Sequence, residues 1–215
     1  MSQQEPTIAL LPWGNVLEDF IDTIGVSLET FCNEFTGSYM FGYVGALRRA
    51  GVRTVLVCVS ARVAKPSRFT HKPTGATVCV LPAPWIYRAL RRNMCNPYGR
   101  TVRHIFGEIR GTRLVLFPAL VVLRELVLYL TTPVRLLARE LRRENCDAML
   151  CQEYEYPRFD VCVLLGRLMR LPVFATFQGG DYQRSHLERL VRPLALRACA
   201  GLIIATQSEV RRVRA

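Results

Sequence analysis

The sequence predicts an α/β fold, a three-layer Rossmann-like sandwich built around a mainly parallel sheet. In its last third, short apolar segments at 147–151, 173–177 and 202–205 alternate with two helix-length amphipathic segments. This alternation is typical of parallel strands joined by crossover helices. Each apolar segment stops at polar residues, and ligands of open α/β sheets bind beyond the carboxyl ends of the strands. We therefore expect one crevice, lined by Gln152, Glu153, Gln178, Gly179, Gly180, Asp181 and Ser208.

The N-terminal part of the chain fits the same plan. Residues 8–11 are apolar and end at Pro12-Trp13-Gly14, which predicts a first strand and its turn. The acidic stretch 15–35 is expected to be a long loop holding one helix near 27–33. A helix is predicted over 37–50, because its apolar residues share one face and Ser38 suits the N-cap.

The middle of the chain is less regular. Residues 52–59 and 76–81 are apolar and predict strands, and the polar stretch 61–75, with two prolines, predicts a loop. Residues 82–113 mix arginines with aromatic and aliphatic residues. This mixture is typical either of a solvated helix face or of a surface that meets lipid headgroups or another anionic partner.

The segment 114–144 predicts helix. Residues 114–134 are apolar enough for a membrane span, but Arg124 and Glu125 lie near the middle, where charges are costly in hydrocarbon. We expect a buried helix or one lying on a membrane surface. Further helices are predicted at 160–169 and 186–199, and Thr206 with Glu209 predicts a capping box for a last helix.

The charge balance argues for an anionic partner. Lys and Arg number 29 against 17 Asp and Glu, a formal net charge of +12. Such a surplus suits a phosphate-bearing ligand, an acidic membrane surface or nucleic acid. Nearly all the cations are Arg, which suits forked phosphate contacts, although a genomic base-composition bias produces the same ratio. The arginines form no recognised nucleic-acid module, so no nucleic acid is expected as a partner.

The cysteines and histidines predict no metal site. The eight cysteines include no Cys-x-x-Cys pair and no Cys/His group with zinc-ligand spacing. His71, His104 and His186 are scattered and are expected at the surface. Eight unpaired cysteines fit a reducing compartment, and residues 1–6 lack the features of a signal peptide. A cytoplasmic location is expected, either free or at the cytoplasmic face of a membrane.

Three motifs carry a family resemblance: Asp147-Ala-Met-Leu-Cys-Gln-Glu, Pro172-Val-Phe-Ala-Thr-Phe-Gln-Gly-Gly-Asp and Ala200-Gly-Leu-Ile-Ile-Ala-Thr-Gln-Ser-Glu. With the strand, glycine loop and helix that precede them, they resemble the N-terminal domain of a GT-B fold glycosyltransferase of the subfamily 4-like kind. The resemblance covers nearly the whole chain, and its last 70 residues carry it best.

This resemblance implies a function and a division of labour. Residues 1–215 correspond to the acceptor-side domain, and the donor-binding C-terminal domain lies outside this sequence. The implied reaction moves a sugar from a nucleotide-sugar to a glycan or lipid-linked acceptor, without a further cofactor. Gly37 and Ser38 match the donor diphosphate loop, and Trp13, Gln152, Gln178, Gly179, Gly180 and Asp181 match the acceptor side. We expect the chain alone to transfer little or no sugar, and a C-terminal half acting in trans would complete it.

The chain departs from the family pattern at two positions. Gln152 and Gln178 stand where relatives often have His, and a glutamine amide is no general base at neutral pH. Glu153 is then the remaining candidate for orienting or deprotonating an acceptor hydroxyl. Its alternatives are a solvated loop or a partner for an Arg, and Asp181 is either a ligand contact or a helix cap.

The glycines after the first strand also allow two interpretations. Gly37 precedes a helix N-terminus, where backbone N–H groups and the helix dipole favour an anion. Alternatively it serves chain reversal, while Gly42 and Gly45 allow close helix packing. The glycine spacing is neither the dinucleotide fingerprint nor a phosphate loop. Two other functions stay open: a non-catalytic sugar- or phosphate-binding module, and a nucleotide-dependent Rossmann enzyme.

Overall fold

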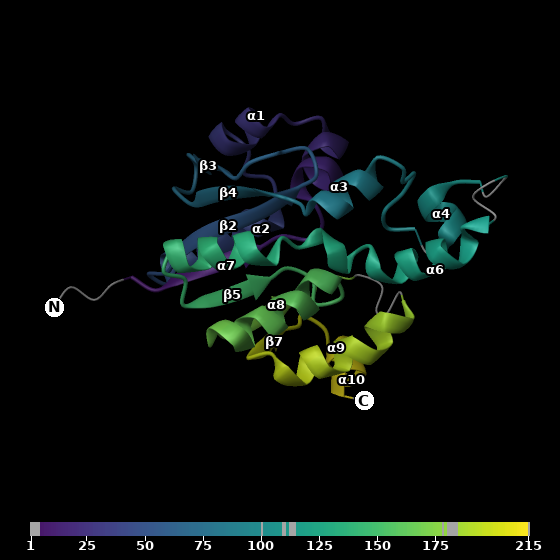
Figure 1. Ribbon diagram of the computed structural model, residues 1–215. Coiled ribbons are helices and arrows are strands. Elements are labelled where there is room, and N and C mark those ends of the chain that lie inside the picture. The colour runs from purple at the N-terminus through teal and green to yellow at the C-terminus, as the bar shows by residue number, and fades with distance from the viewer. Residues whose placement is uncertain are drawn as a thin grey trace.

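The computed structural model describes residues 5–99, 101–108, 111, 115–177, 179 and 185–214. They form one seven-stranded sheet in the order β3-β4-β2-β1-β5-β6-β7, covered by helices on both faces (Figure 1). Neighbouring strands pair in parallel, except for β3, which is antiparallel to β4 at one edge. The predicted three-layer, mainly parallel fold is therefore confirmed.

Apart from β3, the strands lie where the apolar runs predict them. Their bounds are β1 Thr7–Leu11, β2 Arg53–Ser60, β3 Ser67–Thr70, β4 Thr77–Pro82, β5 Ala148–Cys151, β6 Val173–Thr176 and β7 Gly201–Ile203. The central strands are buried on both faces because helices cover each face, which explains their continuous apolar sequences. Cys58, Cys79 and Cys151 are buried within them, as expected for cysteines acting as small apolar residues.

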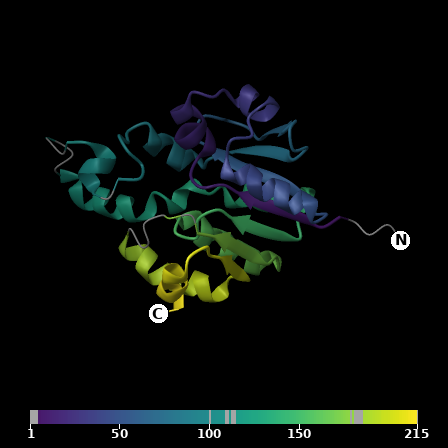
Figure 2. The ribbon, with the colours of Figure 1, turned by 180° about the vertical axis from the view of Figure 1, so that it is seen from behind.

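One face of the sheet is covered by the N-terminal helices, α1 (Leu28–Asn33) and α2 (Tyr39–Arg49), the latter best seen in Figure 2. The Ser27 hydroxyl accepts from Thr30 N–H and that of Ser38 from Met40 N–H, so each helix begins at a serine cap. Buried apolar residues of α1 and α2 pack on alternate residues of β1, β2 and β4. Leu10 and Leu56 are among these fully buried strand residues.

The other face is covered by α7 (Val134–Arg143), α8 (Pro157–Met169) and α9 (His186–Ala198). Leu137 and Leu141 of α7 and Phe159 of α8 pack on this side of the sheet. The arginines at 135, 139 and 142 point to solvent from the opposite face of α7, as its pattern predicts. The last helix, α10 (Gln207–Arg214), follows β7.

A third group of helices lies beyond the carboxyl ends of the strands (Figure 1). It consists of α3 (Trp85–Arg91), α4 (Val102–Phe106) and α6 (Phe117–Leu126), which share a small core of their own. A short 3-10 turn, η3 (Tyr129–Thr131), joins this group to α7. No helix formed by the described residues is long and apolar enough to cross a bilayer.

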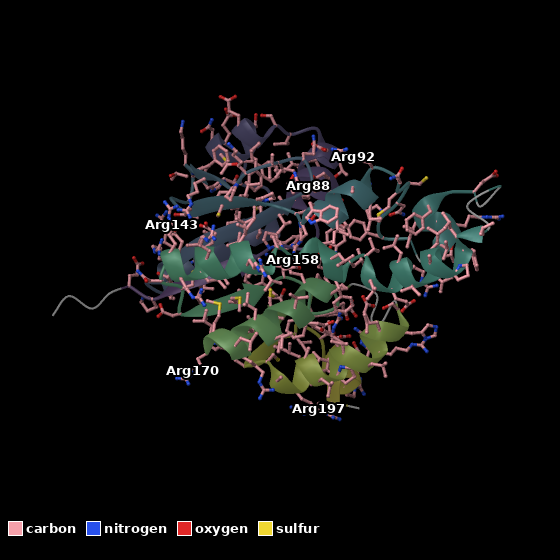
Figure 3. The ribbon with its side chains drawn as sticks, viewed as in Figure 1. Arg88, Arg92, Arg143, Arg158, Arg170 and Arg197 are labelled. Atoms are coloured by element: carbon pink, nitrogen blue, oxygen red, sulfur yellow. The ribbon has the colours of Figure 1, made fainter. Side chains whose placement is uncertain are left out.

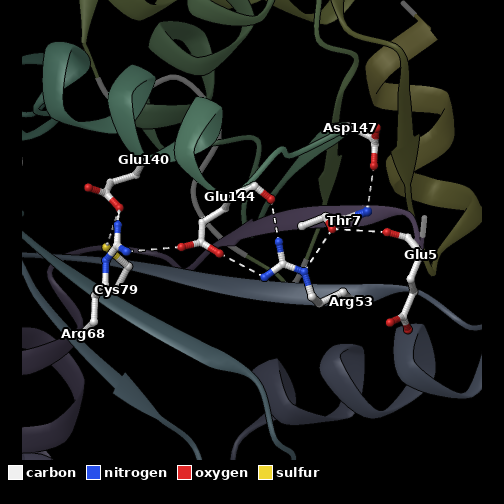
Figure 4. A network of polar contacts seen from close by, with 8 residues as sticks. All are labelled: Glu5, Thr7, Arg53, Arg68, Cys79, Glu140, Glu144 and Asp147. Atoms are coloured by element: carbon white, nitrogen blue, oxygen red, sulfur yellow. Dashed lines mark hydrogen bonds and ion pairs between the residues drawn. The ribbon is translucent and has the colours of Figure 1, made fainter.

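The amino edge of the sheet is closed by ion pairs (Figure 4). The guanidinium of Arg53 on β2 donates to Thr7 Oγ1 at 3.1 Å and to Glu144 Oε2 at 2.9 Å. Arg68 on β3 pairs with Glu140 of α7 and reaches Glu144 at 3.3 Å. These contacts hold α7 to the strands at this edge.

Four expectations about local structure were wrong. The predicted loop 61–75 contains the edge strand β3, and the acidic stretch 15–35 contains a π-helix, η1 (Leu17–Ile21), and a 3-10 turn, η2 (Asp22–Ile24), besides α1. Of the two interpretations of the apolar helix, burial is wrong at α6, because Val115, just before it, is 83% exposed and Val122, within it, is 58% exposed. The alternative, a helix lying on a membrane surface, stays a prediction. His71 is fully buried rather than at the surface, whereas His104 and His186 are exposed as expected.

Candidate functional site

The strand order reverses between β1 and β5, and this reversal locates the candidate site. From β1 the chain builds β2 and β4 on one side, and it then returns to add β5, β6 and β7 on the other. Two adjacent parallel strands whose connections leave in opposite directions open a crevice at their carboxyl ends. The loops 12–15 and 152–156 follow these two strands. Residues predicted from sequence in both loops, Trp13, Gln152 and Glu153, thus lie at the switch point.

A buried arginine that was not predicted from the sequence joins the loop after β1 to the helix that follows β5. Arg158, in the first turn of α8, is 2% exposed. Its Nη1 donates to the carbonyls of Pro12 at 2.8 Å and Gly14 at 2.6 Å. No carboxylate among the described residues lies within ion-pair distance of it, and its face lies over the ring of Tyr156. Its visible role is to fix the backbone of the loop that follows β1.

Aromatic rings surround that loop. Trp13 stacks on Tyr98 with 4.9 Å between ring centroids, and Tyr156 lies 6.1 Å from Trp13. Trp13 itself remains half-buried. Because Tyr98 comes from the segment between α3 and α4, this cluster also joins the third helix group to the sheet. It gives the switch point an apolar wall of the kind that sugar rings and bases pack against.

Two acidic residues of the 15–35 stretch, Asp19 and Glu18, accept hydrogen bonds from this loop and from the end of β2 respectively. Asp19 accepts from the backbone N–H of Asn15 at 2.6 Å and from the hydroxyl of Tyr98. Burial, with Tyr156 and Asp19 nearby, raises the pKa of Tyr98, so the phenol keeps its proton and donates it. Glu18 accepts from Ser60 Oγ and Ala61 N–H, both at 2.7 Å. These carboxylates therefore have structural partners.

Gln152 and Glu153 are both buried at the end of β5. The Gln152 backbone N–H donates to the Leu11 carbonyl at 2.8 Å, which continues the β1–β5 pairing by one bond. Its side-chain amide is buried and has no hydrogen-bond partner among the described residues. Glu153 has a φ of +69°, a left-handed conformation that is uncommon for a residue other than glycine. Such strain is found preferentially at functional sites.

The N-terminus of α2 lies close to this turn. Among the causes that raise the pKa of Tyr39, burial is the largest, and the negative charge of Glu153 is the next. Ser38 is buried as the cap of the helix, and Gly37 before it is exposed. The charge of Glu153 therefore acts on Tyr39, the first residue of α2, which follows Gly37 and Ser38.

The remainder of the 152–156 loop contacts the last helix. Arg212 of α10 pairs with Glu155, donates to Tyr154 Oη at 3.2 Å and pairs with Glu209 at 2.5 Å. It also lies over the ring of Phe177. Glu155 is therefore an Arg partner, one of the alternatives for this acidic loop. Thr206 accepts from Glu209 N–H at 3.4 Å as predicted, although the Glu209 carboxylate pairs with Arg212.

The second predicted loop is only partly described. Gln178, Gly180 and Asp181 lie outside the described residues. Gly179 is exposed with a φ of +103°, the sharp turn expected of it. The helix after this loop is capped by Ser185, which forms a capping box with Glu188. Ser208 is exposed in the first turn of α10, where its hydroxyl donates to Thr206 Oγ1 at 3.3 Å.

The glycines near α2 are not explained by tight packing. A Cβ built on Gly42 would meet nothing within 4 Å, and one on Gly45 only the Arg49 guanidinium at 3.6 Å. The expectation of close helix packing at these two positions was therefore wrong. A Cβ on Gly37 would meet only the ring of Phe35 at 3.7 Å, and Gly37 does not have a positive φ. Local sterics do not require glycine there.

No group of three or more His, Cys, Asp or Glu side chains in the described part of the chain is arranged to hold a metal ion. The cysteines of the described residues are unpaired, and burial raises the pKa of most of them, including Cys58 and Cys79. A raised pKa keeps these thiols protonated, which suits packing rather than nucleophilic chemistry. The site's chemistry thus rests on the amide, carboxylate, aromatic and backbone groups described above.

Sheet order and crossovers define the molecule as a doubly wound, Rossmann-like α/β domain with its switch point between β1 and β5. No family model matches the sequence, and no curated protein matches it. Among solved structures it is similar to UDP-N-acetylglucosamine 2-epimerase from Rickettsia bellii, with 11% identity and a TM-score of 0.42. That alignment covers 98% of this chain and 42% of the epimerase, so this chain spans less than half of the epimerase's length.

Proposed function

We propose that this chain is the acceptor-side domain of a GT-B glycosyltransferase, which moves a sugar from a nucleotide-sugar to a glycan or lipid-linked acceptor. The observation that carries this proposal is the meeting of three features at the switch point: the N-terminus of α2, the strained turn at Glu153 and the aromatic loop of Trp13. The motifs at 147–153 and 172–181 resemble that family, and they contain β5 and β6 respectively.

The donor diphosphate is assigned to the N-terminus of α2. The backbone N–H groups of its first turn and the helix dipole attract an anion there. Gly37 leaves the approach to this turn free of a side chain, and Ser38 adds a hydroxyl. In sugar transfer by this class, the developing charge on the departing diphosphate is the main quantity that the protein has to stabilise. Gly37 and Ser38 would supply that stabilisation from this domain.

The acceptor is assigned to the loops after β1, β5 and β6. Trp13 offers a flat apolar surface, and the Gln152 amide offers a donor and an acceptor atom. Glu153 would orient an acceptor hydroxyl and take its proton, while Gln178, Gly179, Gly180 and Asp181 would close the acceptor side. A donor-binding partner domain, acting in trans or from further chain, would complete the active site.

A second function is favoured by one specific observation. Gln152 and Gln178 replace the histidines that such enzymes often carry. None of the histidines among the described residues lies at the switch point. A module that binds a sugar or a phosphate without turning it over would need no base. Such a module would bind the same ligands through the same residues, with no transfer in the presence of any partner.

Binding of nucleotide-sugars to Gly37→Asp tests the proposal. This substitution places a carboxylate at the N-terminus of α2, where it would repel a diphosphate, and the space around Gly37 accepts a side chain. NMR titration of the wild-type chain with UDP-, ADP- and GDP-glucose should show binding to at least one. We expect Gly37→Asp to weaken that binding about tenfold or more, a loss typical for one charge-assisted contact.

Gly45→Asp is the matched control, because it adds the same charge to the same helix two turns further along. It should change the dissociation constant less than twofold. Equal weakening by both variants, or no binding of any nucleotide-sugar to the wild type, would contradict the assignment of the diphosphate site.

A further inference from the structure

An apolar groove runs between α8 and α9. Its volume is about 450 Å³, within the range of small-molecule sites. The residues that line it are Tyr129, Asp160, Val161, Val163, Leu164, Arg167, Leu187, Val191, Leu194, Ala195 and Ala198. None of them belongs to the candidate site described above.

The Asp160 carboxylate at the base of the groove bonds to Arg192 and Tyr129, while Arg192 Nη1 has no partner among the described residues. Asp160 Oδ1 accepts from Arg192 Nε at 2.6 Å, and Oδ2 accepts from Arg192 Nη2 at 3.1 Å and from the Tyr129 hydroxyl at 2.8 Å. Both side chains of the ion pair are buried. Because this carboxylate is already bonded and Arg192 does not line the groove, a ligand gains little polar contact at the base, and most of the other lining residues are aliphatic. The interior of the groove therefore selects an apolar group.

The mouth of the groove is apolar as well. Leu164 of α8 is 63% exposed and Leu194 of α9 is 64% exposed, and both line it. Exposed leucines on facing helices leave apolar surface in water, and contiguous surface of this kind marks a binding site. A ligand that covers it would remove that surface from water.

One end of the groove is positively charged. α8 and α9 run in the same direction across the sheet, so their C-terminal ends lie on the same side (Figure 1). Arg167 lines the groove towards this end, and Arg170 and Arg197 extend outward from the ends of the two helices (Figure 3). In the described part of the chain, no carboxylate lies within ion-pair distance of these three arginines.

We propose that this groove binds a single-chain anionic amphiphile of the fatty-acid class, independently of the sugar-transfer function. The aliphatic chain lies between α8 and α9 over Leu164 and Leu194, and the anionic head meets Arg167 at the C-terminal end. Charge complementarity selects this occupant, because an apolar slot that ends in unpaired guanidinium groups matches a chain that ends in a carboxylate or phosphate.

The same observations argue against other occupants. A second copy of the chain would bring its own arginines against these, with no carboxylate of the groove free to neutralise them. A flat bilayer surface covers exposed leucines but does not fill a recess whose walls include Val161, Ala195 and Ala198. A free chain with one anionic end fits both the recess and the charge.

Calorimetric titration of the full chain with dodecanoate, below its critical micelle concentration, tests this assignment. We expect saturable binding of one molecule, and weaker binding of dodecanol, which has the same chain without the charge. Arg167→Gln should weaken dodecanoate binding about tenfold and remove its advantage over dodecanol. Leu164→Gln should weaken both ligands about equally.

The matched controls are Leu168→Gln and Arg139→Gln. Leu168 is an exposed leucine one turn after Leu164 that does not line the groove, and Arg139 is an exposed arginine of α7. Both variants, and Gly37→Asp, should bind dodecanoate like the wild type. The proposal is overturned by absence of saturable binding, or by equal effects of Leu164→Gln and Leu168→Gln. Binding to phosphatidylglycerol vesicles without binding of free dodecanoate, or self-association that Leu164→Gln abolishes, would also overturn it.

Discussion

Arg158 decides how the loop after β1 is held. Its guanidinium supplies donors to two buried carbonyls, those of Pro12 and Gly14, and the positive φ of Gly14 presents its carbonyl there. There is no room for a side chain at Gly14, because a Cβ built there would lie 2.9 Å from the Tyr98 hydroxyl oxygen. Arg158, Gly14 and Tyr98 therefore fix one loop conformation together.

Replacing Arg158 with Met should destabilise the domain and loosen this loop. Met keeps much of the apolar stem but leaves both carbonyls without a donor, at a cost of about 2–3 kcal/mol in the free energy of unfolding, because relief from burying the cation offsets part of the loss. Urea unfolding measures the loss, and near-UV circular dichroism should report the altered packing of Trp13. Arg167→Met, an exposed change on the same helix, should stay within about 0.5 kcal/mol of wild type.

His71 is buried, and its position in the sequence did not indicate its structural role. Its ring stacks on Phe41 with 3.9 Å between centroids, Nε2 lies 2.8 Å from the Phe35 carbonyl and Nδ1 lies 2.7 Å from Thr74 Oγ1. The carbonyl can only accept, so Nε2 carries the proton and Nδ1 accepts from the threonine. A neutral imidazole satisfies both bonds. Burial lowers the pKa of His71, against a smaller opposing effect of the Phe35 bond.

The lowered pKa predicts a pH dependence of stability. The unfolded chain binds this proton more readily than the folded chain, so the stabilisation is complete above the unfolded pKa of about 6.5 and is lost as the pH falls below it. The free energy of unfolding should therefore decline from about pH 7.5 to pH 5 more steeply in wild type than in His71→Gln. The exposed His104→Gln variant should keep the wild-type slope. Parallel curves for wild type and His71→Gln would contradict a neutral, buried His71.

These residues show what local pattern leaves open. The sequence alone can locate the ends of predicted strands and helices. It therefore singled out Gln152 and Glu153 after a strand, and Gly37 and Ser38 at the start of a helix. The contacts of Arg158, Tyr98 and His71 join segments far apart in the chain, and only the fold brings them together. The left-handed turn at Glu153 has no signal in its own sequence, because glutamate rarely adopts it.

Among the elements, α8 and α9 are joined by the Asp160–Arg192 ion pair. Two hydrogen bonds connect the side chains, and the Tyr129 hydroxyl adds a third contact from η3. Burial raises the pKa of Asp160, and the bonds from Arg192 oppose this effect. The pair therefore joins α8 to α9 within the helix layer.

Asp160→Asn should destabilise the domain strongly, because it leaves the Arg192 charge buried without a counter-charge. Breaking a buried pair on one side costs about 3–5 kcal/mol. Chemical unfolding followed by circular dichroism measures the change. The exposed pair of Arg62 and Asp22 is the matched control, and Asp22→Asn should cost less than about 1 kcal/mol. A similar cost at both sites would contradict the role assigned to the buried pair.

Elements with strong apolar periodicity were predicted, and those with other sources of stability were not. The strands at 52–59 and 147–151 and the helices at 37–50 and 186–199 lie as expected, because burial on known faces sets their pattern. β3 was missed, since a four-residue edge strand pairs on one side only and Arg68 stabilises it through α7. For α6, hydrophobicity predicted burial, yet much of its apolar surface faces outward.

At the scale of the whole molecule, the two edges of the sheet differ in kind. The amino edge is closed by paired charges between strands and α7, whereas the carboxyl edge carries the aromatic loop, the strained turn and the α2 N-terminus. This polarity follows from parallel strands, which place every strand-to-helix loop on the same side. The fold class was therefore predictable from alternation alone, and the site's exact partners were not.

The most direct test of the central claim is to map, by NMR chemical-shift changes on the uniformly ¹⁵N-labelled chain, the residues that a nucleotide-sugar contacts. Shift changes on titration with the best-binding nucleotide-sugar should concentrate at residues 13–15, 37–40 and 152–154, around the switch point between β1 and β5. Changes confined to the amino edge, or to the groove between α8 and α9, would contradict the account.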